Sequence, residues 1–343
     1  MPTPPIRSGF RWHTLAIAAL TIGLLWLFFR GLDIREIGRA ISRAHWGLIL
    51  VAVASVFVTY VLRAWRWLSL LRPLGHARFV PAFRTTVIGF MATFLLPARI
   101  GEVLRPYLMA RHEGLQPAAT FATIVIERLL DLATVLLLFA VALPFAGVDV
   151  GGPTRLWSAL FAIAAVAGLA ILFVLAGHPE RLGRVTARLT RRLPAKLAGT
   201  AEHLVRTFAE GLKVMRSPGH LATAVAWSIP VWISIAVTIW LTSQAFDLTF
   251  SFLGSFLVVG YLTVGVALPT PGGAGGFHAF YLLALTQFFG ANPAVAGAAA
   301  IVLHLVSFVP ISILGLVYMW QDGLSLGRLK GMAKKTDNDQ VRS

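Results

Sequence analysis

One short segment carries the residues best suited to bind an anion. Arg99, Glu102 and Arg105 follow directly on an uncharged stretch, Thr85–Ala98. An arginine guanidinium presents a planar fork of donors that matches the oxygens of a phosphate. A helix beginning near Ile100 would add unpaired backbone amides, which favour an anion at the same place. We therefore predict a phosphate-binding site at this segment.

Two further arginines, Arg63 and Arg66, stand at the end of the preceding apolar stretch. Ionisable groups at membrane depth are costly, so they are functional candidates by default. We add both to the predicted phosphate site. The alternative is that Arg99 only pairs with Glu102, and that Arg63, Arg66 and Arg111 extend to the membrane interface.

Glu127, Arg128 and Asp131 form a second charged group inside the apolar stretch 118–142. Glu127 and Asp131 are four residues apart, so they share one face of a helix. These residues could close an ion network with Arg99 or Arg105 and balance its charge. Alternatively, one carboxyl could take up a proton during transport. The sequence leaves both roles open.

A glycine-rich break lies inside the stretch from Leu248 to Gln321, which has no Asp, Glu, Lys or Arg. Irregular backbone at membrane depth must be buried in protein or line a cavity, and free N–H groups can hold a phosphate oxygen. The Lys-Ser/Thr ending of a P-loop is missing. A close helix crossing is the alternative role. The residues predicted to line a headgroup site are Pro269, Pro271, Gly272, Gly273, Gly275, Gly276 and His278.

Composition limits the function classes. Of 343 residues, 57% are hydrophobic and 13% charged, which indicates a membrane protein. The absence of cysteine excludes thiol chemistry, and no His/Asp/Glu cluster has metal spacing, so we expect no metal and no cofactor. The Lys and Arg residues behind the net charge of +16 lie mostly on the cytoplasmic segments described below, as in other membrane proteins, so we expect no nucleic-acid binding.

Apolar run lengths predict an all-α polytopic membrane protein, because a span needs about 20 apolar residues. Two apolar segments, 80–111 and 252–290, are broken in the middle. We predict that both are re-entrant hairpins of two half-helices. We predict six full transmembrane helices at 12–30, 46–66, 118–142, 156–177, 221–246 and 294–320.

The charge distribution orients the chain. With both termini in the cytoplasm of an inner membrane, 24 of the 30 Lys and Arg fall on cytoplasmic segments. We predict that residues 30–45 form a loop on the outer side, and its four arginines are the one exception to this distribution.

The predicted halves share one plan of span, span, hairpin, span. The first covers 1–145 and the second 155–321, interrupted by a basic amphipathic cytoplasmic linker, 178–219, and followed by a basic tail, 322–343. The hairpins enter from opposite sides, and inverted repeats with broken helices favour a substrate site at the midplane. Val87-Ile88-Gly89-Phe90 echoes Val258-Val259-Gly260-Tyr261, and Tyr107 echoes Tyr281.

Several motifs together resemble the lysylphosphatidylglycerol synthase transmembrane region family of flippase-like proteins. They are Arg63-Ala64-Trp65-Arg66-Trp67 with Leu71-Arg72-Pro73, Pro97-Ala98-Arg99-Ile100-Gly101-Glu102-Val103-Leu104-Arg105-Pro106-Tyr107, Glu127-Arg128-Leu129-Leu130-Asp131, and Pro269 to Phe277. The resemblance implies a lipid-translocating module. In that family the module is regarded as translocating aminoacylated phosphatidylglycerol, and other members are linked to polyprenyl-phosphate sugar carriers or hopanoid pathways.

Full synthases of that family continue into an aminoacyl-transfer domain, whereas this sequence stops shortly after its last predicted span. We therefore expect no lysyl transfer and no enzyme. The expected function is flipping or scrambling of an anionic phospholipid or polyprenyl-phosphate-type lipid, with pathway enzymes as further partners at the cytoplasmic face. Two alternatives stay open. One is a non-transporting accessory protein of a lipid or glycan pathway, and the other is a membrane-embedded transferase with Glu102 or Glu127 as base.

Overall fold

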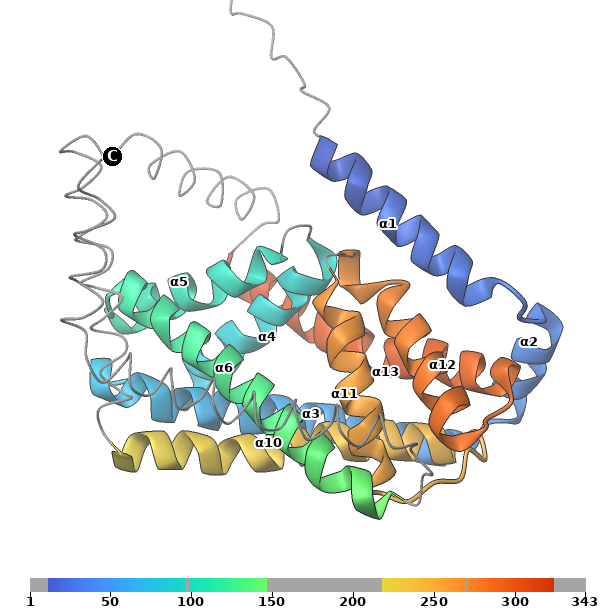
Figure 1. Cartoon of the computed structure of the whole chain (residues 1–343). Helices are drawn as coiled ribbons and strands as arrows, with labels where there is room; N and C mark the ends of the chain where they lie inside the picture. The colour runs from blue at the N-terminus through green and yellow to red at the C-terminus, as the bar shows by residue number, and fades with distance from the viewer. Residues whose placement is uncertain (1–11, 97–98, 147–217, 269, 324–343) are drawn as a thin grey trace, which may run out of the picture.

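A computed structural model describes residues 12–96, 99–146, 218–268 and 270–323 (Figure 1). Within these ranges all regular structure is helical. The predicted span 156–177 lies outside them, as do almost all of the linker 178–219 and the tail after residue 323. The last two residues of the predicted linker, Pro218 and Gly219, begin a helix.

The helices follow the predicted segments closely. They are α1 Trp12–Phe29, α2 Ile34–Arg43, α3 Trp46–Leu71, α4 Phe79–Leu95, α5 Gly101–Glu113, α6 Pro117–Ala142, α10 Pro218–Gln244, α11 Gly254–Ala267, α12 Gly276–Phe289 and α13 Pro293–Gln321. Three stretches of the described chain, Trp46–Leu74, Gly219–Gln244 and Pro293–Gln321, are long and apolar enough to cross a membrane. Ile17–Phe29 with Ile34–Arg43, bent by 77°, would make a fourth. The count of six spans stays a prediction.

The predicted end of the second span at residue 66 was wrong. Helix α3 continues to Leu71, so Arg63 and Arg66 lie within it rather than at its end. Both side chains are buried, Arg66 completely, and neither extends to the interface. The helix can continue because acidic residues of α6 pair with these charges, as described below.

The residues predicted as an outer loop, 30–45, contain the helix α2. The side chain of Asp33 caps it by accepting a hydrogen bond from the backbone N–H of Arg35. Ile37 is buried, α2 packs on α13, and the arginines of α2 are exposed. Three of the four discordant arginines, Arg35, Arg39 and Arg43, therefore stand on the exposed face of an amphipathic helix, and Arg30 precedes it.

Each predicted hairpin segment is a pair of short helices that pack on each other, α4 with α5 and α11 with α12. Both pairs cross at two glycines. A Cβ on Gly101 would lie 1.8 Å from the carbonyl oxygen of Gly89, and a Cβ on Gly265 would lie 2.6 Å from that of Gly276. Only glycine permits backbones to approach this closely.

The helix contacts repeat between the two halves of the chain, if α3, α4, α5 and α6 are taken as the equivalents of α10, α11, α12 and α13 in that order. Helix α4 packs on α13 as α11 packs on α6, and α5 packs on α6 as α12 packs on α13. Helix α3 packs on α4 as α10 packs on α11, and α3 lies along α10 (Figure 1). The α3–α10 pair is antiparallel, because the His45 N–H donates to the Ala245 carbonyl at 2.8 Å while Arg66 reaches Ser228.

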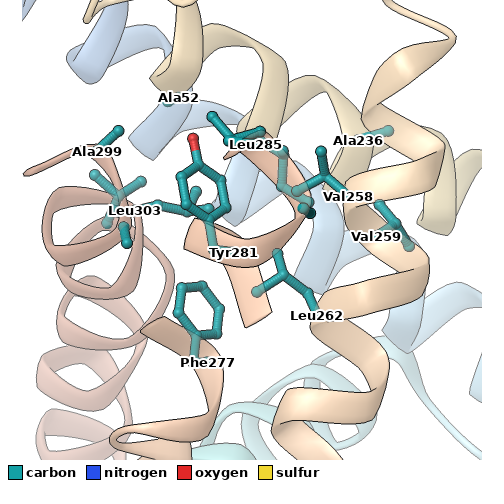
Figure 2. Packing of buried hydrophobic residues seen from close by; sticks show 14 of the residues in the cluster. Ala52, Ala236, Val258, Val259, Leu262, Phe277, Tyr281, Leu285, Ala299 and Leu303 are labelled. Carbon is teal, nitrogen blue, oxygen red and sulfur yellow. The ribbon is translucent and has the colours of Figure 1, made fainter. Parts of the chain in front are cut away.

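The largest apolar core surrounds Tyr281 of α12, which is packed among Val258, Leu262, Leu285 and Leu303 (Figure 2). Its ring is fully buried and its hydroxyl lies 2.7 Å from the Ser243 hydroxyl. Since the Ser243 hydroxyl donates to the Ile239 carbonyl, Tyr281 is the donor of this pair.

Replacing Tyr281 by phenylalanine is expected to lower the free energy of unfolding by about 1 kcal/mol, since the Ser243 oxygen loses its donor. Thermal unfolding in detergent measures this loss. The double variant with Ser243→Ala leaves no polar group unpaired, so it should be more stable than Tyr281→Phe alone. If the double variant is less stable than Tyr281→Phe alone, the loss of stability comes from packing and not from the hydrogen bond.

Candidate functional site

Arg66 is the centre of a buried ion cluster between α3 and α6. Its Nη1 lies 2.6 Å from Asp131 Oδ1 and its Nη2 lies 3.0 Å from Glu127 Oε1. The side chains of Arg66 and Glu127 have no exposed surface. The four-residue spacing of the two acids on α6 lets a single guanidinium from α3 bridge them.

Three further arginines complete this cluster. Arg105 Nη1 of α5 lies 2.9 Å from Glu127 Oε1, and the Arg105 guanidinium carbon lies 4.0 Å from the centre of a Trp67 ring. Arg128 Nη2 lies 3.2 Å from Glu127 Oε1 and 3.5 Å from Asp131 Oδ2. Arg63 Nη1 is 3.8 Å from Asp131 Oδ2. The predicted network therefore forms, with Arg105 as the partner from α5.

The cluster contains four guanidiniums and two carboxylates, so it has two more positive than negative groups. Burial of an unpaired charge is strongly unfavourable, and retaining one calls for a counter-charge from outside the cluster. The indole N–H of Trp232 donates to Asp131 Oδ1 at 3.1 Å, which further satisfies that acid without changing the charge difference.

A cavity of about 350 Å³ borders this cluster. Arg63, Arg128 and Asp131 form part of its wall, and Arg99 joins them from the break between α4 and α5. Much of the remaining wall is apolar, with Val56, Tyr60, Phe90, Phe94, Leu132, Trp232, Ile235, Ile239, Val259, Leu262, Val266, Ala267, Phe277, Leu303 and Phe308. The cavity thus has charged groups from the first half of the chain and a largely apolar remainder, which suits an amphiphile.

Arg99 links the two chain breaks. It has a positive φ of 51°, and its Nη2 donates a hydrogen bond to the carbonyl oxygen of Val266, in the last turn of α11. Carbonyls in the last turn of a helix lack partners within the helix and attract positive charge. Arg99 also lies 3.5 Å from Glu102 Oε1, so the pair that the sequence offered as the alternative to phosphate binding forms as well. Both side chains are partly exposed.

The glycine-rich break is a turn that packs on α4 and on α1. Gly272, Gly273 and Gly275 have positive φ, and a Cβ on Gly275 would lie 2.6 Å from Leu24 Cβ. The Gly272 carbonyl oxygen lies 2.9 Å from His304 Nε2. This turn serves close packing, the alternative that the sequence left open.

The headgroup-lining role of this turn is not seen in this conformation. Phe277 lines the cavity, whereas Pro271, Gly276 and His278 do not. The His278 ring instead lies 4.6 Å from that of His304 and 5.1 Å from that of Phe28. Pro269 lies outside the described residues, and the role stays a prediction.

Sequence reasoning missed several wall residues, among them Tyr60, Phe90 and Trp232. The sequence position of Trp232 could have identified it. Tryptophans that anchor a protein at the membrane interface lie at span ends, whereas Trp232 lies well inside an apolar stretch, where its N–H needs an acceptor. Phe90 lies beneath Arg63 at 5.0 Å and Arg128 at 5.9 Å from the ring centre.

Relatives of this chain include two archaeal proteins that are named as membrane proteins. A UPF0104 membrane protein of Methanothermobacter thermautotrophicus is 24% identical over 82% of this chain and 87% of its own length. A UPF0104 membrane protein of Methanocaldococcus jannaschii is 25% identical over 79% of this chain and 83% of its own length. A Haloferax volcanii protein named glycosyltransferase AglD is 28% identical over 38% of this chain, which is 20% of its own length.

The sequence model of one family, described as the lysylphosphatidylglycerol synthase TM region, matches residues 13–315. The match includes every residue of the ion cluster and all described residues that line the cavity. It also includes both broken segments. This chain is therefore an integral membrane protein that belongs to the lysylphosphatidylglycerol synthase transmembrane-region family.

Proposed function

We propose that this protein flips or scrambles an anionic, phosphate-bearing lipid or lipid-linked intermediate. The observation that carries the proposal is the central cavity, with arginines on one part of its wall and apolar side chains on much of the rest. A phosphate is matched by guanidinium donors, and a lipid's apolar part by the remaining wall. We assign phosphate contacts to Arg63, Arg99 and Arg128.

Arg66, Arg105, Glu127 and Asp131 hold this arrangement in place. Arg66 and Arg105 are buried behind the wall and bind the acids directly, so they position Arg63 and Arg128 rather than touch the lipid. Asp131 lines the cavity, so it is the acid that can exchange a proton with groups inside the cavity.

The matched helix contacts support an inverted repeat with two re-entrant hairpins. Such a repeat places its substrate site between the halves, near the midplane. The link from Arg99 to Val266 and the packing of α4 on the Pro271–Gly273 turn bring the two breaks together, as this arrangement requires. We further propose an inner-membrane location with both termini in the cytoplasm, from the distribution of Lys and Arg.

Replacing Arg99 by alanine is expected to slow lipid flipping in proteoliposomes by roughly tenfold or more, because a charge-assisted hydrogen bond contributes about 1.5–3 kcal/mol. The assay measures the loss of fluorescent anionic lipid from the inner leaflet. Arg35→Ala, on the exposed face of α2, serves as the control and should leave the rate unchanged. An Arg99→Ala protein that folds well and flips at the wild-type rate would remove Arg99 from the site.

Two other functions remain as alternatives. The resemblance to a protein named glycosyltransferase, over a small part of its length, favours a role near a lipid or glycan pathway. An accessory protein would bind a pathway partner and flip no lipid. A transferase would form product from a labelled lipid-linked donor, which the same proteoliposomes can test.

A further inference from the structure

We propose that the cavity selects a lipid whose phosphate group carries two negative charges, a phosphomonoester or a diphosphate, over a phosphodiester with one. This inference rests on the proposed binding of an anionic lipid and specifies the headgroup charge. The inference rests on the positions of Arg63 and Arg128, which both line the cavity. The acids beside them are already neutralised by other arginines.

The first step is that both carboxylates are paired without the cavity arginines. Arg66 contacts Asp131 at 2.6 Å and Glu127 at 3.0 Å, and Arg105 contacts Glu127 at 2.9 Å. Neither Arg66 nor Arg105 lines the cavity. These two guanidiniums and two carboxylates already form a neutral group, of which only Asp131 lines the cavity.

The second step is that Arg63 and Arg128 are held more loosely. Arg63 approaches Asp131 only to 3.8 Å, and Arg128 lies 3.2 Å and 3.5 Å from the two acids. Within the described part of the chain, all four arginines of the cluster have nitrogens without a hydrogen-bond partner, but only Arg63 and Arg128 line the cavity, where a ligand can reach Arg63 Nη1 and Arg128 Nε. The Arg63 residue is only 8% exposed. Buried donors of this kind need an acceptor.

The third step is that the surrounding groups add no net charge. Phe90 lies beneath both guanidiniums and orients them by cation–π attraction without neutralising them. Arg99 also lines the cavity, but Glu102 lies 3.5 Å from it, so this pair contributes no net charge. Two positive charges therefore remain at the cavity wall. A dianionic phosphate balances both, whereas a phosphodiester leaves one unpaired.

Competition between two matched lipids tests this inference. Dioleoyl phosphatidate and dioleoyl phosphatidylmethanol share their acyl chains and differ by one methyl ester. The retained lipid is measured by native mass spectrometry after equal loading at roughly pH 8, above the second phosphate pKa of about 6. Wild-type protein should retain phosphatidate in excess by about tenfold. At roughly pH 5, where phosphatidate carries one charge, the same protein should lose this preference.

Variants add a second test. The single variants Arg63→Gln and Arg128→Gln, the latter at a partly exposed residue, should each bring the ratio of retained phosphatidate to retained phosphatidylmethanol at the higher pH close to one. Arg78→Gln, at the exposed start of α4, should keep the wild-type preference. Equal retention of both lipids by the wild type at the higher pH would overturn the dianion inference and leave anionic-lipid binding intact. Retention of neither lipid would count against the proposed function as well.

Discussion

Glu127→Gln is expected to lower the free energy of unfolding by about 3–5 kcal/mol, the cost of breaking a buried ion pair by removing one partner. The carboxylate is fully buried and lies within 3.2 Å of Arg66, Arg105 and Arg128. Its loss leaves one carboxylate among four guanidiniums. Thermal unfolding in detergent, followed by tryptophan fluorescence and by the fraction that remains monodisperse, measures the effect.

Two companion variants make this expectation specific. Glu102→Gln removes a carboxylate that is about one-third exposed and 3.5 Å from Arg99, so it should cost less than about 1 kcal/mol. The double variant Glu127→Gln with Arg105→Gln removes one charge of each sign and should recover part of the loss. A double variant no more stable than Glu127→Gln would show that the loss is not electrostatic.

The sequence was sufficient to predict where the long apolar helices lie, because apolar run length and chain breaks follow from residue type alone. The all-helical class, the family and the breaks before Arg99 and at the glycine-rich turn were all predicted. Helix α2 was missed, although Asp33 followed by Glu36 resembles a capping box, because its arginines were assigned to a loop.

The partners of the charged residues could be predicted only in outline. The spacing of Glu127 and Asp131 indicated a shared face, but the arginine that bridges both acids proved to be Arg66, which had been placed at a helix end. Which charges pair depends on how α3, α5 and α6 pack, and a single sequence does not contain that information. The cavity wall likewise combines residues from distant helices, such as Phe90 and Trp232.

The sequence echo between the two halves did not identify equivalent contacts. Gly89 packs on α5, whereas its proposed counterpart Gly260 packs on Phe139 of α6. Tyr281 is buried in the core, while Tyr107 is about one-third exposed. Short apolar motifs recur by chance, so the matched helix contacts are the stronger support for an inverted repeat.

The crossing of Gly89 and Gly101 leads to the second large expected effect. Gly101→Ala should lower the free energy of unfolding by about 3 kcal/mol, the upper part of the usual range for overpacking. The new Cβ would lie 1.8 Å from the Gly89 carbonyl oxygen and 2.6 Å from the Thr93 backbone nitrogen. Both obstacles are backbone atoms, which cannot rotate away, so α4 and α5 must separate.

Separation of these helices would also displace Arg105, one turn further along α5, from Glu127. Thermal unfolding in detergent should therefore show a lower Tm. Gly38→Ala is the matched control, since it lies inside α2 with nothing within 4 Å of the new Cβ, and alanine there should stabilise by up to about 1 kcal/mol. If Gly101→Ala unfolds at the wild-type temperature, the α4–α5 crossing is wider than described, and Arg105 does not depend on this glycine for its position.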